Sequence, residues 1–394
     1  MKDICSEHIC TGCGLCVTVC SKCAISFRKG KLGHLFPIID QTKCIDCGLC
    51  QKKCPAINTP NLYYPKKAYA AFSKDIEDYK SSTSGGAASV FSNYIIEQGG
   101  IVYGCAVCKT NNKTLDVKHI RVSEKEDLLL LKGSKYVQSR ITDVLPLIKS
   151  DIKDGKKVLF IGTPCQTAAV RNLFPRNPDN LYVVDIICHG VPSLAILHTH
   201  IKNKIGNKEI DKIRFRDGSE LYLQLIQGNK VLYGSYLFKE RYKDEYYNAF
   251  MDGFTYRLSC HNCSFAGSKR VSDITIGDFW GLGKENDASY IKPHDDGISV
   301  ILPITDKGVE LIEAVSSRLN IYERSVSEAI NGNDQLREPK TINKRIRFFK
   351  YISCILPFKY AYSLSVLDIK MRKCIVKVLS ILGIKNFIKK ICKK

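Results

Sequence analysis

Short apolar runs and longer amphipathic runs alternate along much of the chain. The apolar runs predict strands, because they are rich in β-branched and aromatic residues, and they cover residues 68–74, 101–107, 117–122, 157–162 and 181–188. The amphipathic runs predict helices at residues 87–98, 163–174 and 189–201. Strands that alternate with helices favour an α/β body with a largely parallel or mixed sheet.

The segment before this body has a different composition. Residues 57–67 are rich in Pro, Asn and Tyr and are typical of a linker, so we expect a small separate domain ahead of them. A chain of 394 residues with 44% hydrophobic and 25% charged residues can bury the cores of two or three domains. No stretch approaches the ~20 uninterrupted apolar residues of a membrane-spanning helix.

Nineteen cysteines are the most informative part of the composition. A small secreted protein would use them in disulfides, but the number is odd and the N-terminus has no apolar signal region. We therefore expect a reducing cytoplasm, where clustered cysteines more often bind metal or carry out redox chemistry.

Eight of the cysteines form a repeat with a constant offset of 34 residues. Each half has the spacing C-x2-C-x2-C-x3-C of bacterial ferredoxins, in which the fourth cysteine of one half completes the cluster of the other. The repeat predicts two 4Fe-4S clusters, one bound by Cys10, Cys13, Cys16 and Cys54 and the other by Cys44, Cys47, Cys50 and Cys20. A zinc ribbon is the alternative, although zinc needs only two pairs of ligands. Cys5 and Cys23 lie outside the repeat and are expected to be spare thiols.

A second group of four cysteines is spread over the predicted body. Cys165 and Cys188 each follow a predicted strand at the expected start of a helix, and Cys260 and Cys263 form a CxxC pair. If the two strands are neighbours, both thiols reach the same sheet edge, where a helix N-terminus would stabilise each thiolate. The four could bind a third 4Fe-4S cluster. The alternatives are buried small residues, a zinc site or a dithiol redox pair.

Other features of the body are open to more than one interpretation. Residues 81–89 contain hydroxyls and glycines that lead into a helix, so their N–H groups could cradle a phosphate, although an ordinary helix start explains them as well. Residues 132–140 could hold a cofactor or form a plain polar loop. Cys105 and Cys108 lie in a predicted strand, where residues three apart point to opposite faces, and are expected to pack in the core.

Several stretches, taken together and in this order, resemble the coenzyme F-420 hydrogenase/dehydrogenase beta-subunit family, which includes plant 7-hydroxymethyl chlorophyll a reductase. They are STSGG (82–86), GSKYVQS (133–139), GTPCQ (162–166), and CHG (188–190) with SDITIGDFWG (272–281). The resemblance covers roughly residues 1–330 and implies a flavoprotein with FAD beside iron–sulfur clusters. Carried over residue by residue, it implies flavin contacts from Thr83, Ser84, Gly85, Gly86, Lys135, Tyr136 and Gln138.

The resemblance also suggests how the chain is divided. We expect an α+β domain of the two-cluster ferredoxin type at 1–60, a flavin-binding part at 66–150, a part with flavin and third-cluster residues at 151–335, and a helical tail at 340–394. The role of Asp273, Asp278 and Trp280 in the last motif stays open, with a structural turn as the alternative.

The function implied is that of an oxidoreductase. Clusters transfer single electrons and flavin collects two, so an external ferredoxin could drive the two-electron reduction of a substrate or a deazaflavin coenzyme, or the reverse. No residue is assigned a catalytic role, and Cys165 as a nucleophile is the less favoured interpretation. The alternatives are an electron-transfer adapter subunit without its own substrate and a zinc-stabilised scaffold.

The charge distribution adds one expectation about partners. The net charge is +21, and residues 340–394 contain 15 Lys and Arg against one acid, Asp368. Basic and apolar residues at helical spacing are typical of helices that lie on an anionic lipid surface. A cytoplasmic protein with such a tail could take a peripheral position on the inner membrane face and act on a small-molecule or lipid-linked substrate, with docking of the tail on the body or on a partner as the alternative. No nucleic-acid recognition motif accompanies the charge, so nucleic acid is not an expected partner.

Overall fold

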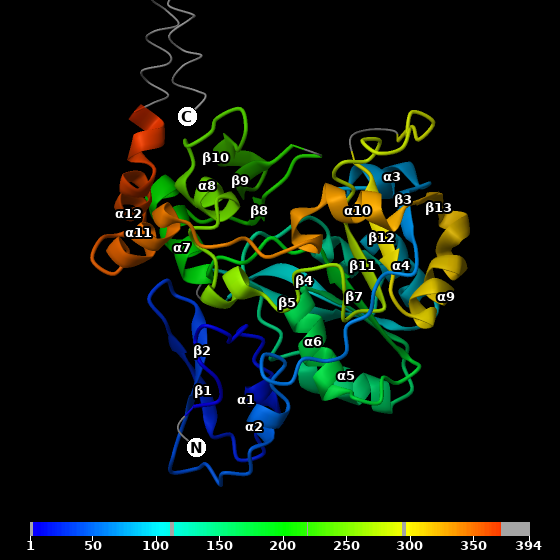
Figure 1. Ribbon diagram of the computed structural model, residues 1–394, viewed down its shortest axis with the longest axis horizontal. Helices are drawn as coiled ribbons and strands as arrows, with labels where there is room; N and C mark the ends of the chain where they lie inside the picture. The colour runs from blue at the N-terminus through cyan, green and yellow to red at the C-terminus, as the bar shows by residue number, and fades with distance from the viewer. Residues whose placement is uncertain (1–2, 111–113, 219, 294–296, 372–394) are drawn as a thin grey trace, which may run out of the picture.

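One eight-stranded sheet forms the centre of the molecule. The structure is a computed structural model that describes residues 3–110, 114–218, 220–293 and 297–371. In spatial order the strands are β13 (Leu319–Arg324), β3 (Ala68–Ser73), β12 (Ser299–Pro303), β11 (Ile274–Asp278), β7 (Leu181–Ile186), β6 (Val158–Gly162), β4 (Ile101–Lys109) and β5 (Leu115–Val122). The four strands β11, β7, β6 and β4 run parallel, and the outer strands pair antiparallel. The sheet is therefore mixed, in agreement with the predicted α/β class (Figure 1).

Helices bury both faces of the central strands. Val184 of β7 belongs to the core on one face and its neighbour Val183 to the core on the other. The first face is covered by α4 (Ala87–Glu97) and α9 (Asp306–Val315), and the second by α5 (Leu145–Lys153) and α6 (Pro164–Leu173). Burial on both faces explains why these strands are apolar throughout instead of alternating.

One predicted helix begins later than the sequence pattern indicated. The expected helix at 189–201 is α7 (Leu194–Ile205), which starts where the Ser193 side chain accepts a hydrogen bond from the N–H of Ile196. Cys188 consequently lies in the loop after β7 and not at a helix start, so that prediction was wrong. The pattern also missed the short helix α3 (Ile76–Lys80).

A smaller antiparallel sheet was not predicted. It consists of β8 (Lys212–Arg214), β9 (Tyr222–Gln227) and β10 (Lys230–Tyr236), in the order β10-β9-β8. Its apolar side chains share a core with α7 and with α8 (Glu245–Met251). The Gly228-Asn229 pair between β9 and β10 is a hairpin signal, with Gly228 at φ +55°, and it could have identified this sheet.

The N-terminal unit keeps its repeat in the backbone. It contains α1 (Leu15–Val19), the antiparallel pair β1 (Ile25–Lys29) and β2 (Leu35–Ile39), and α2 (Leu49–Lys52). Each short helix is preceded by a glycine with positive φ, 77° at Gly14 and 68° at Gly48. The N–H of Cys10 donates to the Ser6 carbonyl at 3.0 Å, and that of Cys44, 34 residues later, donates to the Asp40 carbonyl at 3.1 Å. The two halves therefore fold in the same way.

Two helices of the tail pack on the body. They are α11 (Lys344–Ile352) and α12 (Phe358–Ser365), whose buried side chains share a core with Ala249 and Phe254. The rest of the predicted tail, residues 372–394, lies outside the described residues. The remaining helices are α10 (Val326–Gly332) and the 3-10 turns η1 (Glu126–Leu131), η2 (Leu258–Asn262), η3 (Ser316–Arg318) and η4 (Asp334–Leu336). In the part of the chain that the structure describes, no helix is both long and apolar enough to cross a membrane.

Candidate metal and cofactor sites

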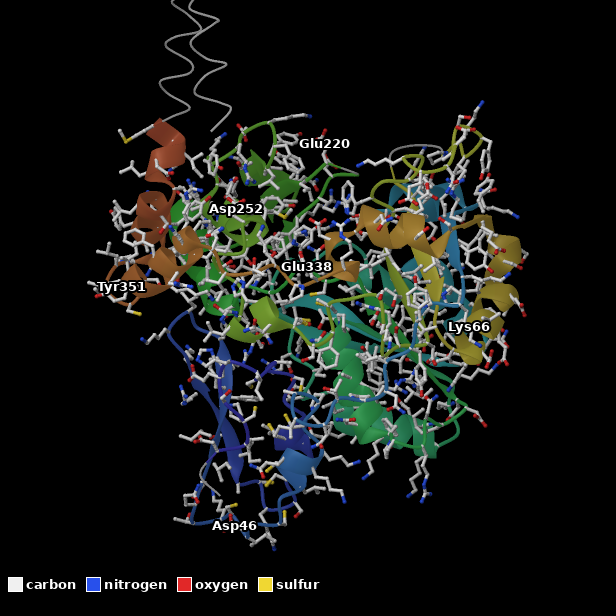
Figure 2. The ribbon with its side chains drawn as sticks, in the orientation of Figure 1. Asp46, Lys66, Glu220, Asp252, Glu338 and Tyr351 are labelled. Carbon is white, nitrogen blue, oxygen red and sulfur yellow. The ribbon has the colours of Figure 1, made fainter. Side chains whose placement is uncertain are left out.

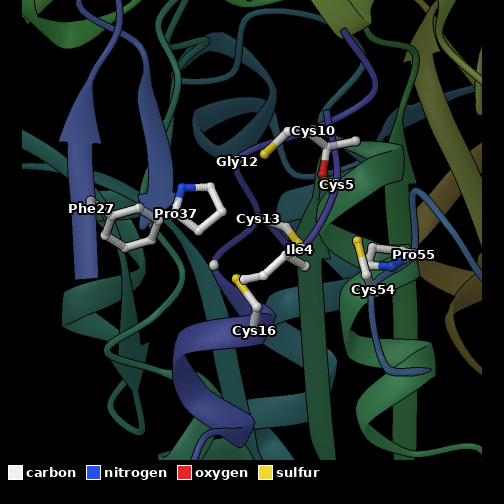
Figure 3. A pocket seen from close by; sticks show the side chains of 12 residues that line it. Ile4, Cys5, Cys10, Gly12, Cys13, Cys16, Phe27, Pro37, Cys54 and Pro55 are labelled. Atoms are coloured by element: carbon white, nitrogen blue, oxygen red, sulfur yellow. The ribbon is translucent and has the colours of Figure 1, made fainter. Parts of the chain in front are cut away.

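The first cavity of the N-terminal unit is lined by thiols from both halves of the repeat. Its cysteines are Cys5, Cys10, Cys13, Cys16 and Cys54. Figure 3 shows the side chains of Cys10, Cys13, Cys16 and Cys54 gathered around this space. Backbone N–H groups of Gly12, Leu15 and Val17 donate hydrogen bonds to the sulfurs of Cys10, Cys13 and Cys16, respectively. Thiols that converge from separate segments and accept backbone hydrogen bonds are the donor set that a 4Fe-4S cluster takes.

The second cavity contains the other four cysteines of the repeat. Its lining includes Cys20, Cys44, Cys47 and Cys50, so here too one cysteine comes from the opposite half. The two cavities differ in exposure, because Cys10, Cys16 and Cys54 are buried whereas Cys47 is exposed and the other three are half-buried. The structure thus brings together each predicted set of four, one set beside the body and one nearer to solvent.

A single metal ion has no comparable site among the residues that the structure describes. No three His, Cys, Asp or Glu side chains in residues 3–110, 114–218, 220–293 and 297–371 are placed to hold one ion. A cubane cluster presents several irons to its thiolates, so its ligands surround the cluster and do not meet at one point.

Cys5, which was expected to be a spare thiol outside the repeat, lines the first cavity. Its thiol hydrogen-bonds with Cys10 and Cys54, which raises the pKa of Cys5. The hydrogen bond from Cys5 lowers the pKa of Cys10 to about 6, although burial acts to raise it. The positive charge of Arg257 also lowers this pKa. Burial is the main cause that raises the pKa of Cys13 to about 11, and the charges of Cys54 and Cys10 add to it. Cys5 has no place in the repeat, and no local pattern indicates that it reaches this cavity.

The third group of cysteines meets at the carboxyl edge of the sheet. β6 and β7 are parallel neighbours with Gly162 opposite Asp185, so Cys165 and Cys188 each lie three residues beyond this pair, at the same end of the sheet. Cys260 lies in η2 and Cys263 directly follows it. The four thiols are close enough to raise the pKa of one another. The structure therefore brings together all four residues of the predicted third site.

The expected stabilisation of these thiolates by helix N-termini does not dominate. Burial is the main influence and raises the pKa of Cys188 to about 12 and that of Cys260 to about 11, and it also raises the pKa of Cys165. Arg270 opposes this at Cys188 and Cys263 through its positive charge. A site of this kind releases its protons when a cation binds, because the metal charge outweighs the cost of burial.

The two polar loops that the sequence singled out are neighbours. The Thr83 hydroxyl lies 3.3 Å from that of Ser134, and Lys132 Nζ donates to Asp78 at 2.6 Å. Gly85 lies so close to the sheet that a Cβ atom there would be 2.1 Å from the Ala71 carbonyl oxygen. Ser84 Oγ lies 3.4 Å from Ser299 Oγ, and Gly86, with φ +83°, begins α4. The glycines of this loop are thus required by the fold, whatever the loop binds.

The three predicted flavin contacts in residues 135–138 point to different surroundings. Lys135 Nζ donates to the carbonyls of Leu131 at 2.7 Å and Lys132 at 2.8 Å, and burial lowers its pKa to about 8. The Tyr136 ring stacks on Phe250 with centroids 5.0 Å apart. Gln138 Nε2 donates to the Thr11 carbonyl at 3.0 Å. Gln138 therefore connects the body to the N-terminal unit.

The residues of the SDITIGDFWG motif have structural partners. Asp273 is fully buried, accepts from the N–H of Val183 at 2.9 Å and from the Thr305 hydroxyl at 2.8 Å, and pairs with Arg171 at 2.8 Å. Asp278 pairs with Arg216 at 2.6 Å, and Trp280 is exposed. Asp273, which directly precedes β11, thus connects this strand to β7, to α6 and to the start of α9.

Cys105 and Cys108 both lie in β4, which pairs with β5 in continuous register, so their side chains point to opposite faces as expected. Cys105 packs against the core shared by the small sheet and α7. Both Cys105 and Cys108 influence the pKa of Lys135, so the two thiols lie within electrostatic reach of the same ammonium group.

Comparison with known proteins identifies two domains. Residues 155–329 match the family model for the C terminus of the coenzyme F420 hydrogenase/dehydrogenase beta subunit, and residues 9–57 match a 4Fe-4S dicluster domain. The chain is similar to a subunit of the F(420)H(2) dehydrogenase of Methanosarcina mazei, with 24% identity over 55% of this chain and 62% of that protein. It is also similar to an uncharacterized protein of Methanocaldococcus jannaschii, with 25% identity over 59% of this chain and 73% of that protein.

Two further matches are more partial. A coenzyme F420-dependent sulfite reductase of Methanocaldococcus jannaschii is 27% identical over 44% of this chain but only 26% of its own length. A chain in the F420-reducing [NiFe] hydrogenase complex of Methanosarcina barkeri superposes with a TM-score of 0.47 at 20% identity, over 80% of this chain and 94% of that chain. The matched part spans less than two thirds of the dehydrogenase protein and of the sulfite reductase. The chain thus resembles the coenzyme F420 hydrogenase/dehydrogenase beta-subunit family through residues 155–329 and a 4Fe-4S dicluster domain through residues 9–57.

Proposed function

We propose that this protein is an iron–sulfur flavoprotein oxidoreductase that passes electrons between three 4Fe-4S clusters, FAD and a substrate or deazaflavin coenzyme. The observation that carries the proposal is the arrangement of twelve cysteines in three groups of four, two of them lining separate cavities of the N-terminal unit and one at the sheet edge. Such clusters supply one-electron transfer, and a flavin supplies the conversion between one and two electrons.

In this proposal the cysteines act as ligands in the sets that the fold brings together. The first set is Cys10, Cys13, Cys16 and Cys54, the second is Cys20, Cys44, Cys47 and Cys50, and the third is Cys165, Cys188, Cys260 and Cys263. The more exposed second set is suited to meet an external ferredoxin, because its Cys47 reaches the surface. The third set is half-buried at the sheet edge of the body and is suited to pass electrons onward.

The flavin would lie at the two neighbouring loops, 81–89 and 132–140. The family resemblance and the contact between Thr83 and Ser134 support this placement. Lys135 is the residue suited to handle a proton there, because its burial lowers its pKa to about 8, close to the pH of a cell. Ser84, Gly85 and Gly86 would contribute backbone N–H groups rather than side chains.

The outer face of the tail helices fits an anionic membrane surface. Its exposed apolar side chains are Phe348, Tyr351, Ile355, Tyr360, Leu364, Leu367 and Met371, and Lys344, Arg345, Arg347 and Lys359 are exposed among them. Figure 2 shows Tyr351 at the outer edge of the molecule, directed away from the body. Each basic residue near an anionic surface contributes about 1 kcal/mol, and the apolar side chains would enter the interfacial region. A lipid-linked substrate and a position on the inner membrane face would suit this surface.

The test is an iron, flavin and visible-spectrum analysis of the full chain purified without oxygen. We expect about twelve irons and one FAD per chain, since each cubane holds four irons. Replacing Cys188 or Cys263 by serine should lower the iron content to about eight, whereas the exposed tail thiol Cys354 serves as the matched control and should leave it unchanged. About eight irons and no flavin in the unmodified chain would contradict the proposal.

An electron-transfer adapter without its own substrate is the second candidate. The name of the similar Methanosarcina mazei protein describes a subunit of a larger dehydrogenase, which favours this alternative. An enzyme should turn over alone with a dye as electron donor and a suitable acceptor, whereas an adapter should reduce only its partner protein.

A further inference from the structure

A buried arginine joins the N-terminal unit to the body. Arg257 is only 1% exposed, although it lies between two separately folded parts. Its Nε donates to the Cys10 carbonyl at 2.6 Å and its Nη2 to the Leu35 carbonyl at 2.6 Å, both in the N-terminal unit. The guanidinium also lies 4.3 Å from the centre of the Phe36 ring. From the body side, its Nη1 donates to Gln138 Oε1 at 3.2 Å.

The same guanidinium contacts a thiol of the first cavity. Nη2 lies 3.4 Å from Cys10 Sγ, within hydrogen-bond range for a sulfur acceptor. The backbone of Arg257 is fixed at the third group, because its carbonyl accepts from the N–H of Cys260 at 3.0 Å and its N–H donates to the Val191 carbonyl at 3.1 Å. One residue therefore contacts the first set of thiols through its side chain and the third set through its main chain.

The second cavity has a charge of the opposite sign at the corresponding thiol. Cys44 is equivalent to Cys10 in the repeat, and its Sγ lies 3.7 Å from the carboxylate of Asp46. Lys22 lines that cavity as well, and both Asp46 and Lys22 are exposed, so solvent and salt screen their charges. Figure 2 shows Asp46 at the end of the N-terminal unit that is remote from the body.

We propose that Arg257 is a positioning residue that makes the first cluster the more easily reduced of the two in the N-terminal unit and holds it beside the Cys260 turn. This inference rests on the proposed function. Reduction adds one negative charge to a cluster, and a buried cation that hydrogen-bonds to a ligand sulfur stabilises that charge. At the second cavity the nearby charges of Asp46 and Lys22 belong to exposed side chains, so they act on the second cluster far more weakly than buried Arg257 acts on the first. Electrons that enter at the exposed second cluster are thereby drawn to the first, and from there toward the third set in the body.

The test is a potentiometric titration of the full chain, followed by electron paramagnetic resonance. Arg257→Gln removes the charge, Arg257→Lys keeps it but loses the forked geometry, and Arg324→Gln is the matched control. Arg324 is also buried and ion-paired, with Glu328 at 2.8 Å, but it belongs to β13 at the far edge of the sheet. Iron content is measured on every variant.

In Arg257→Gln we expect the equilibrium constant for reducing the first cluster to fall at least tenfold. The midpoint potential of its signal, the higher of the two ferredoxin-type signals, should therefore fall by at least about 59 mV, the equivalent for a one-electron couple. The second signal should stay in place, Arg257→Lys should shift in the same direction by less, and Arg324→Gln should not shift. If Arg257→Gln loses iron, the potential of the first cluster is compared between Arg257→Lys and the unmodified chain instead.

An unchanged potential with iron retained, an equal shift of both signals, or the same shift in Arg324→Gln would overturn the role of Arg257. Absence of cluster iron from the unmodified chain would instead overturn the proposed function, so the two failures are distinguishable.

Discussion

Replacing Phe349 by alanine should release the tail helices from the body. Phe349 is fully buried in the core between α11, α12 and the body, and its ring makes edge-to-face contacts with Phe254 and Phe358 at centroid distances of 5.5 and 6.2 Å. A buried Phe→Ala change costs about 3–5 kcal/mol, from lost burial and the cavity that remains. Its neighbour Phe348 is 48% exposed, so the same change there should cost within about 0.5 kcal/mol.

Hydrogen exchange of the amides in α11 and α12 measures this difference directly. If the helices open as a unit, about 3–5 kcal/mol corresponds to exchange that is roughly 100- to 3000-fold faster in Phe349→Ala. Phe348→Ala should exchange like the unmodified chain. Equal exchange in the two variants would refute the reasoning, because it would mean that the buried face does not hold the tail in place.

The same pair of variants separates anchoring from membrane contact. Phe348 belongs to the exposed apolar face of α11, whereas Phe349 does not. A smaller fraction of Phe348→Ala than of the unmodified chain should therefore sediment with vesicles of anionic lipid. Neutral vesicles serve as the control. Retention of full binding by this variant would count against the proposed membrane surface.

Three further predictions concern the body. Burial lowers the pKa of His119 to about 4 from 6.5, so the unfolded chain binds more protons than the folded chain between these pH values. The folded protein is therefore most stable, with respect to this group, above pH 6.5. As the pH falls toward 4, it loses about 3 kcal/mol of unfolding free energy. His119→Gln should flatten the denaturant midpoint against pH in this window, and an unchanged slope would contradict the assignment. Asp273→Ala leaves Arg171 buried without its carboxylate partner and should lower the free energy of unfolding, measured with urea, by about 3–5 kcal/mol. A decrease below about 1 kcal/mol would show that Asp273 does not hold the neighbouring elements together. Gly85→Ala places a Cβ 2.1 Å from the Ala71 carbonyl oxygen and 2.6 Å from the Ser299 nitrogen. We expect the unfolding free energy to fall by at least about 1–3 kcal/mol in the same assay. An unchanged unfolding free energy would show that β3 and β12 can move away from this Cβ at no cost.

The sequence predicts those parts of the fold whose causes are local. The runs at 157–162 and 181–188 could be predicted as strands of one largely parallel or mixed sheet because each is followed by a helix, and the structure shows them as the parallel neighbours β6 and β7. The start of α7 was misplaced because the helix was expected to follow the strand directly, whereas Gly190 and Pro192 keep the loop extended and the cap at Ser193 decides where the helix begins.

Contacts between distant segments could not be predicted in this way. Nothing near Arg257 in the sequence indicates that its guanidinium reaches Cys10, since 247 residues separate them. The same holds for Cys5, which falls outside the repeat but lines the first cavity. Such contacts depend on how the N-terminal unit docks, and only the folded chain contains that information.

Even so, the sequence of the repeat differs between its two halves at a position where one half contacts the body. Gly12 and Asp46 occupy equivalent positions, and both have positive φ, 70° and 53°. An aspartate tolerates that backbone, so the conformation alone does not demand glycine at position 12. A Cβ there would lie 2.6 Å from Arg257 Nη1 and 2.8 Å from Gln138 Nε2. The two halves of the repeat thus differ where the body approaches one of them, and the glycine marks the half that faces the body.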